Sequence, residues 1–270
     1  MAQSVFSRFQ GVFSRLWPIR WPQPASAEPD EHMRSIGEHL QDLRRVLIVS
    51  MSAWLVATIA CAVLTQKIIA ILIAPLKEVL AGHHTLVKGP IIYSPTDFFT
   101  IPFKVAMVGG FVLSLPIILW QLWTFVSPGL RQAERRFAGP FVASALVLFA
   151  AGACLAYFLM TIWLSLLMAF IGSNATYFPD LNDYLSFLLT AMLAFGITFE
   201  LPIVVVLLGL VGIVSSGWLR RRRKMVWVII IIVANLVTPG VDPFTPMLLA
   251  APLIALYELS TFVLAKVFHR

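Results

Sequence analysis

Residues 46–65 read VLIVSMSAWLVATIACAVLT, a run of 20 residues without a charged side chain. An α-helix rises about 1.5 Å per residue, so this run is long enough to cross the roughly 30 Å hydrocarbon core of a bilayer. Five more apolar runs follow, with short charged segments between them. We therefore predict an all-α polytopic membrane protein with six transmembrane helices, at about Val46–Thr65, Thr100–Val126, Phe137–Ser165, Leu185–Val211, Val226–Val237 and Met247–Val267.

The composition argues against a water-soluble chain. Hydrophobic residues make up 59% of the sequence and charged residues 12%, with a mean hydropathy of +0.88. A soluble protein of this length needs more polar residues to cover its core. Both cysteines, Cys61 and Cys154, fall inside apolar runs and have no Cys–His cluster beside them, so we expect them to be small buried hydrophobic residues.

The positions of the basic residues predict the orientation. With the N-terminus inside, sixteen of the 20 basic residues face the cytoplasm, as cytoplasmic loops prefer. Both termini are then cytoplasmic, and the net charge of +7 reflects topology and contact with anionic lipid, not binding of nucleic acid. The inner set is Arg8, Arg15, Arg20, Arg34, Arg44, Arg45, Arg131, Arg135, Arg136, Arg220–Lys224, Lys266 and Arg270, and the outer set is Lys67, Lys77, Lys88 and Lys104.

Residues 1–35 form an N-terminal extension ahead of a transmembrane domain at 36–270. Apolar residues at helical spacing in the extension fit either an amphipathic helix on the membrane surface or a disordered tail, and a proline-rich linker follows. In the domain, the long outer connection from Gln66 to Asp97 contains apolar stretches that suggest helices of its own. Prolines in or near the spans (Pro102, Pro116, Pro140 and Pro202) favour kinked helices and a curved bundle.

Three groups of residues are candidates for function. The segment EHLQDLRR at 38–45 places Glu38, Asp42 and Arg45 on one helix face, which is also typical of a solvated helix start. Glu134 is the only acid in a cationic inner loop. Glu200 lies near the middle of the fourth span, where a charged side chain costs about 2.5 kcal/mol or more. It is therefore either protonated or exposed to a water-filled recess.

An alternative function is proton-coupled transport of a small solute, with Glu200 as the proton site. Such a transporter needs several polar groups converging at mid-membrane, and the spans offer little beyond Glu200. An intramembrane enzyme is disfavoured because the chain has neither a His-Glu-x-x-His nor a Gly-x-Ser-x-Gly motif. We expect no catalytic residue, cofactor or metal.

Several segments in order resemble the signature motifs of the TatC family, the receptor subunits of the twin-arginine protein translocase. They are EHLQDLRR, ILWQLWTFVSPGL followed by ERR, DYLSF, AFGITFELP, and LVTPGVDPFTPMLLAAPL followed by YE, and they extend over about residues 35–265. The resemblance implies a glove-shaped bundle of six helices in the inner (plasma) membrane. It also implies export of folded proteins, driven by the proton motive force, together with single-span Tat subunits of the A and B types and with self-association.

The resemblance further implies a cytoplasmic site for twin-arginine signal peptides. Asp42 and Glu134 would bind the two arginines, with Phe125, Leu43 and Arg44 beside them. Asp42 stands where the family usually has glutamate, and the TPGVDPF loop is one residue longer than the usual form. Glu200 would be an intramembrane polar position for docking partner helices. Supporting roles fall to His39, Pro75, Pro128, Asp180 and Asp242.

Overall fold

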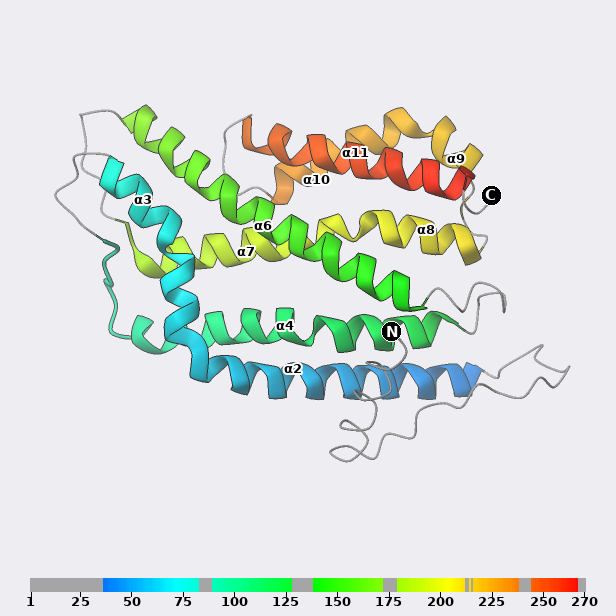
Figure 1. Cartoon of the computed structure of the whole chain (residues 1–270), viewed down its shortest axis with the longest axis horizontal. Coiled ribbons are helices and arrows are strands. Elements are labelled where there is room, and N and C mark those ends of the chain that lie inside the picture. Colours follow the sequence, from blue (N-terminus) through cyan, green and yellow to red (C-terminus); the bar gives the residue numbers. More distant parts are fainter. Residues whose placement is uncertain are drawn as a thin grey trace, which may run out of the picture. The chain divides into compact units, whose positions relative to one another are not determined.

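The computed structural model describes residues 36–82, 89–127, 138–171, 179–211, 214, 216–237 and 244–266. These residues are almost entirely helical, and their β pairing is limited to one bridge between Ile91 and Asp180. The all-α prediction is confirmed. The helices are α2 (Ile36–Leu72), α3 (Ala74–Gly82), α4 (Asp97–Val126), α6 (Ala138–Ile171), α7 (Leu181–Phe199), α8 (Leu201–Val211), α9 (Ser216–Arg221), α10 (Arg223–Val237) and α11 (Phe244–Lys266) (Figure 1).

The chain divides into two compact units, Met1–Gln41 and Asp42–Arg270. The predicted extension at 1–35 lies outside the described residues. Within the described part, four helical stretches are long and apolar enough to cross a membrane, and Ala250–Phe262 is a shorter apolar helix. The count of six spans therefore stays a prediction. The four stretches are Leu40–Ala81, Asp97–Val126, Ala138–Leu166 and Leu181–Gly209.

Helix α2 is longer than the predicted span at 46–65. Its 37 residues correspond to about 55 Å of helix, and its C-terminal part turns sharply away from the long straight part that precedes it (Figure 1). The Thr65 hydroxyl in this region donates to the carbonyl oxygens of Cys61, at 3.1 Å, and Ala62, at 2.8 Å. Hydrogen bonds of this kind often bend helices, so Thr65 contributes to the turn.

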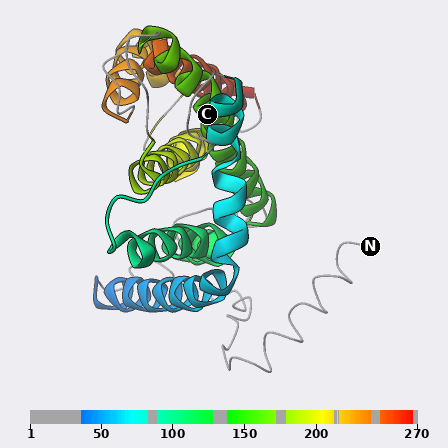
Figure 2. The ribbon, with the colours of Figure 1, turned by 90° about the vertical axis from the view of Figure 1, so that its left-hand side faces the viewer.

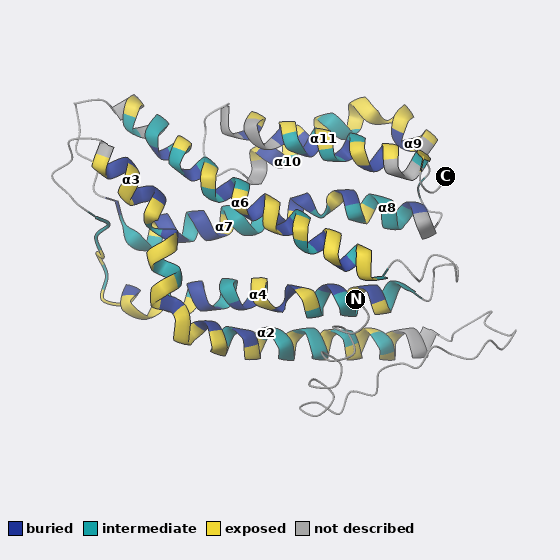
Figure 3. Ribbon diagram, in the orientation of Figure 1, coloured by how far each residue is buried: buried dark blue, intermediate teal, exposed yellow. Residues whose placement is uncertain are grey.

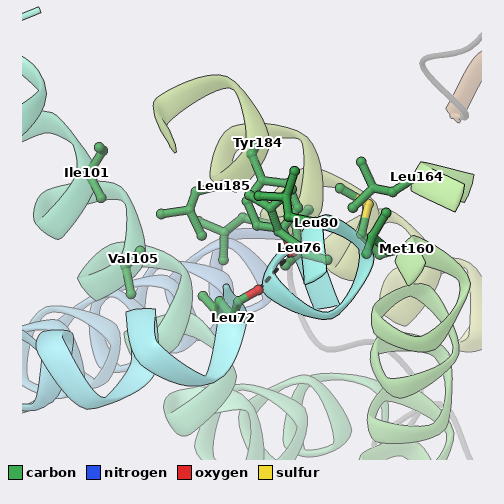
Figure 4. Close-up of a cluster of buried hydrophobic side chains, with 12 residues drawn as sticks. Leu72, Leu76, Leu80, Ile101, Val105, Met160, Leu164, Tyr184 and Leu185 are labelled. Carbon is green, nitrogen blue, oxygen red and sulfur yellow. Dashed lines mark hydrogen bonds between the residues drawn. The ribbon is translucent and has the colours of Figure 1, made fainter. Parts of the chain in front are cut away.

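The predicted outer connection contains helix, as expected, but part of it belongs to α2. After the turn, the end of α2 and the whole of α3 run across the ends of other helices (Figure 2). Leu72, Leu76 and Leu80 pack there against side chains of α4, α6 and α7. The Tyr184 hydroxyl donates to the carbonyl oxygen of Leu72 at 2.9 Å inside this core (Figure 4). The core thus fixes one end of the helices.

Small residues bring α6 and α7 close together. A Cβ atom on Gly152 would lie 2.6 Å from the carbonyl oxygen of Phe195, and one on Gly196 would lie 2.6 Å from Cε2 of Phe149. Neither position has room for a side chain. Close approach at small residues is a common way of packing membrane helices.

The predicted fourth span at 185–211 corresponds to the apolar stretch Leu181–Gly209, and a break divides this stretch into two helices. Helix α7 ends at Phe199, Glu200 forms a turn, and α8 starts at Leu201. Pro202 explains the interruption, because proline has no N–H for the helical hydrogen bond and its ring crowds the preceding turn. The prediction that Pro202 disturbs the helix is confirmed.

The C-terminal helices form a second core. Leu219 of α9, Ile230 and Ala234 of α10, and Leu253 of α11 are buried in one cluster with residues of α6 and α7. Helix α10 has 15 residues, or about 22 Å of helix. It is therefore shorter than the hydrocarbon core of a typical bilayer.

Cys61 is buried, as predicted, and a Cβ on Gly109 would lie 3.3 Å from its sulfur. Cys154 is exposed on α6. The prediction of burial was wrong for Cys154, because an apolar run that faces lipid can leave a small hydrophobic residue outside the protein core.

Candidate functional site

One end of the Asp42–Arg270 unit collects most of the described basic residues. Figure 1 shows the C-terminal end of α4, the N-terminal end of α6, α9 and the C-terminal end of α11 at this end, together with the part of α2 that follows Asp42. We call it the basic end. Its basic residues are Arg44, Arg45, Arg220–Lys224 and Lys266, whereas the opposite end carries Lys67, Lys77 and Lys104.

Four of the five residues assigned to peptide binding lie at the basic end. Asp42 is half-buried on α2, and its neighbours Leu43 and Arg44 are exposed. Phe125 is half-buried in the last turn of α4. The buried Trp123 holds this turn in place by packing its ring against Phe141, with centroids 4.6 Å apart. The structure therefore brings a carboxylate and an aromatic ring to the same end of the unit.

The remaining assigned residues are only partly placed. Glu134, Pro128 and Asp242 lie outside the described residues. His39 belongs to α2, but its side chain is also outside the described part. Their roles stay predictions.

Glu200 occupies the turn between α7 and α8. Its N–H donates to the carbonyl oxygen of Ile197 at 3.1 Å, and its own carbonyl accepts from Ile203 at 3.0 Å and Val204 at 3.1 Å. Its Oε1 atom is buried and has no hydrogen-bond partner among the described residues. Buried polar atoms are nearly always paired, so this oxygen is available to a group from outside the described chain.

The opposite end holds a polar network that was not predicted from the sequence. Lys104 Nζ donates to Asn182 Oδ1 and to Ser186 Oγ, both at 2.8 Å. Asn182 Nδ2 donates to Asp97 Oδ1 at 2.9 Å, and Asp97 is only 5% exposed. The network joins the N-terminal ends of α4 and α7. Lys104, a charge inside an apolar run, was the available signal, because such a charge needs a polar partner.

Two of the predicted supporting residues have structural positions at the opposite end. Asp180 Oδ1 accepts from the N–H groups of Asn182 at 2.7 Å and Asp183 at 3.2 Å, which caps the start of α7. Pro75 is buried at the start of α3. The two hydrogen bonds give Asp180 a part in holding the start of α7.

A second polar group joins α9, α10 and α11 at the basic end. Arg223 donates through both Nε and Nη2 to the carboxylate of Glu258, and Trp227 Nε1 donates to the same carboxylate at 3.3 Å. The hydrogen bond to Glu258 raises the pKa of the Arg223 guanidinium above its usual value. The buried Tyr257 hydroxyl donates to the carbonyl oxygen of Leu219 at 2.9 Å. Helix α9 is thereby attached to α11.

Comparison with known proteins shows which proteins this chain is similar to. Residues 38–252 match the family model described as Sec-independent protein translocase protein (TatC). The TatC protein of Carboxydothermus hydrogenoformans is 36% identical over 228 residues, which cover 84% of this chain and 90% of that protein. The TatC protein of Frankia casuarinae is 36% identical over 233 residues, which cover 84% of this chain and 64% of that protein. The chloroplastic TATC of Arabidopsis thaliana is 34% identical over 251 residues, 93% of this chain and 70% of that protein.

Solved structures agree with the sequence match. One crystal structure of the twin-arginine translocase receptor TatC is 34% identical, covers 86% of this chain and all of its own, and superposes with a TM-score of 0.70. A second, in the detergent DDM, is 32% identical and gives a TM-score of 0.72 over 83% of this chain and 98% of its own. The chain therefore belongs to the TatC family of Sec-independent, twin-arginine translocase proteins, and it is a membrane-embedded transport component rather than an enzyme.

Proposed function

We propose that this protein binds twin-arginine signal peptides at its basic end and exports folded proteins with single-span Tat subunits of the A and B types. The basic end faces the cytoplasm, both termini are cytoplasmic, and the six helices cross the inner (plasma) membrane in a curved bundle. The proton motive force drives transport, and copies of the chain associate with one another. The single observation that carries the peptide assignment is the position of Asp42 on α2. It lies at the same end of the unit as Phe125, in the last turn of α4.

The chemistry of the peptide supports this assignment. An arginine guanidinium presents a planar fork of donors that a carboxylate can accept in bidentate fashion, which an ammonium group cannot match. Asp42 supplies one carboxylate and Glu134, in the loop after α4, supplies the second. The exposed Leu43 and the ring of Phe125 offer apolar contact for the hydrophobic part of the signal peptide.

Glu200 has a different part in the proposal. Its buried Oε1 atom lacks a partner among the described residues, and it lies in a break between two apolar helices. A polar group on a partner helix could satisfy this oxygen, because hydrogen bonds between membrane helices contribute to their association. We therefore assign Glu200 to docking of the single-span partner subunits.

The test is retention of a twin-arginine peptide by the purified full chain. The wild type should retain this peptide in preference to a twin-lysine variant. Asp42→Asn and Glu134→Gln should each lower affinity about ten- to a hundredfold, because a hydrogen bond to a charged group contributes roughly 1.5–3 kcal/mol. Crosslinking of the peptide in membranes measures the same loss.

Two acids at the opposite end provide matched controls. Asp183→Asn and Glu78→Gln make the same chemical changes at exposed positions and should leave peptide retention unchanged. If the Asp42→Asn, Glu134→Gln double variant retains the peptide as well as these controls do, the peptide site lies elsewhere on the chain.

A further inference from the structure

We propose that α9 and the start of α10 form a binding site for an anionic membrane phospholipid. The phosphate lies among the basic side chains that follow Trp218, and the acyl chains extend along the exposed apolar face of α10. This inference requires the membrane location of the TatC family. It does not depend on peptide binding by Asp42 and Glu134.

The headgroup part of the site is a cluster of five consecutive basic residues, Arg220–Lys224, all of them exposed. Glu258 engages Arg223 directly. Among the described residues, no acidic side chain forms an ion pair with Arg221, Arg222 or Lys224. Like charges held this close together repel one another and attract an anion. The cluster therefore has a net positive charge available to a phosphate group.

The cluster is carried by a fixed backbone. Leu219 is 3% exposed and anchors α9 in the C-terminal core, while its carbonyl oxygen accepts the hydroxyl of Tyr257. Arg223, in the first turn of α10, is held by Glu258 of α11. Arg221 and Arg222 lie between these two anchors. Their positions are consequently set by the fold, which lowers the entropic cost of binding a ligand.

The surface next to the cluster suits the apolar part of a lipid. Trp218 is 47% exposed, and the Arg222 guanidinium lies 5.2 Å from the centroid of its ring. Tryptophan is enriched where hydrocarbon meets headgroups. Figure 3 shows exposed residues continuing from α9 along α10, and the large apolar ones are Met225, Val228, Ile229, Ile231 and Ile232.

The two surfaces together select a class of ligand. A soluble anion would use the basic cluster but not the apolar face, and a neutral lipid would use the apolar face but not the cluster. A phospholipid with a net negative charge uses both. The basic cluster also includes the start of the short α10, where a bilayer in contact with the helix has to thin locally.

The test uses the full chain in a neutral detergent, titrated with phosphatidylglycerol and with phosphatidylcholine of the same chain length. Native mass spectrometry counts the bound lipids. Phosphatidylglycerol should bind the wild type more tightly than phosphatidylcholine. The double variant Arg221→Gln, Lys224→Gln should lower the affinity for phosphatidylglycerol roughly thirtyfold, because each cation contributes about 1 kcal/mol. Its affinity for phosphatidylcholine should not change.

Matched variants separate a local site from general charge. Lys67→Gln, Lys77→Gln removes two exposed cations from the opposite end and should leave phosphatidylglycerol affinity within twofold. Arg221→Lys, which keeps the charge and the fold, should retain binding within a few-fold. The proposed site is wrong if the Lys67, Lys77 variant loses as much affinity for phosphatidylglycerol as the Arg221, Lys224 variant does. It is also wrong if the Arg221, Lys224 variant loses none.

A third arm identifies the source of the phosphate. Inorganic phosphate and glycerol 3-phosphate at millimolar concentration should not displace phosphatidylglycerol. If they displace it fully, the site binds a soluble anion and the lipid assignment is wrong. Retention of the twin-arginine peptide, measured on the same variants, tests the proposed peptide site separately from the lipid site.

Discussion

The two ends of the Asp42–Arg270 unit use their charges in different ways. At the opposite end, Lys104 and the buried Asp97 are joined through Asn182, so the charges hold α4 and α7 together. At the basic end, Arg44 and Arg45 of α2 and all five residues of the Arg220–Lys224 cluster are exposed. The network at the opposite end stabilises the fold, whereas we propose that exposed charges at the basic end bind lipid and peptide. The comparison predicts that changes at the opposite end affect stability first and changes at the basic end affect binding first.

The largest expected effect is an all-or-none difference in accessibility between the ends. In a background without Cys61 and Cys154, single cysteines at Ser127 or Ser216 should resist an impermeant thiol reagent added outside the cell. A cysteine at Ser173, in the connection before α7, should react. The same reagent after permeabilisation is the control, and the reverse labelling pattern would overturn the proposed orientation.

The next effect concerns the network at the opposite end. Lys104→Met should lower the free energy of unfolding by about 2–3 kcal/mol, because Asn182 and Ser186 lose a charged donor in a partly buried place. Unfolding in detergent, followed by helicity, measures the loss. Lys67→Met is the matched control, since Lys67 is an exposed lysine of α2, and it should have little effect. An equal effect of both substitutions would show that the network does not stabilise this end.

Two tyrosines compare the ends directly. Tyr184 and Tyr257 are both buried, and each hydroxyl donates to a backbone carbonyl of another helix at 2.9 Å. Replacement by phenylalanine should cost about 1 kcal/mol in each case. Tyr257→Phe should accelerate amide exchange mainly in α9, because its hydroxyl binds Leu219. Tyr184→Phe should instead affect the core that joins α2, α4 and α7. Identical exchange patterns would contradict separate anchoring of the two ends.

How much of the fold can be predicted depends on how far apart in the sequence the interacting residues lie. Apolar runs and prolines are local signals, so the helical stretches and the disturbance at Pro202 were predictable. The extension of α2 beyond Thr65 was not, because Ile68–Leu72 is as apolar as a separate loop helix would be. The Lys104–Asn182 contact joins residues 78 positions apart, and no periodicity indicates such a pair. Asp42 and Phe125 were found through motif resemblance, and the structure adds that they occupy the same end.

The smallest expected effect is that of Glu200→Gln, and it tests how a lone polar group in a span is used. Glutamine keeps the size and hydrogen-bonding capacity of the side chain, so folding and transport should both persist near wild-type levels. Glu200→Ala removes the polar atoms beside a helix break and should impair docking of partner subunits more than peptide retention. Proton-coupled transport through Glu200 requires the opposite result, because an amide does not ionise in the physiological range. Transport assays on both variants, with peptide retention measured in parallel, distinguish the two roles. If Glu200→Gln is as inactive as Glu200→Ala while both still retain the peptide, Glu200 carries a proton and the docking role is wrong.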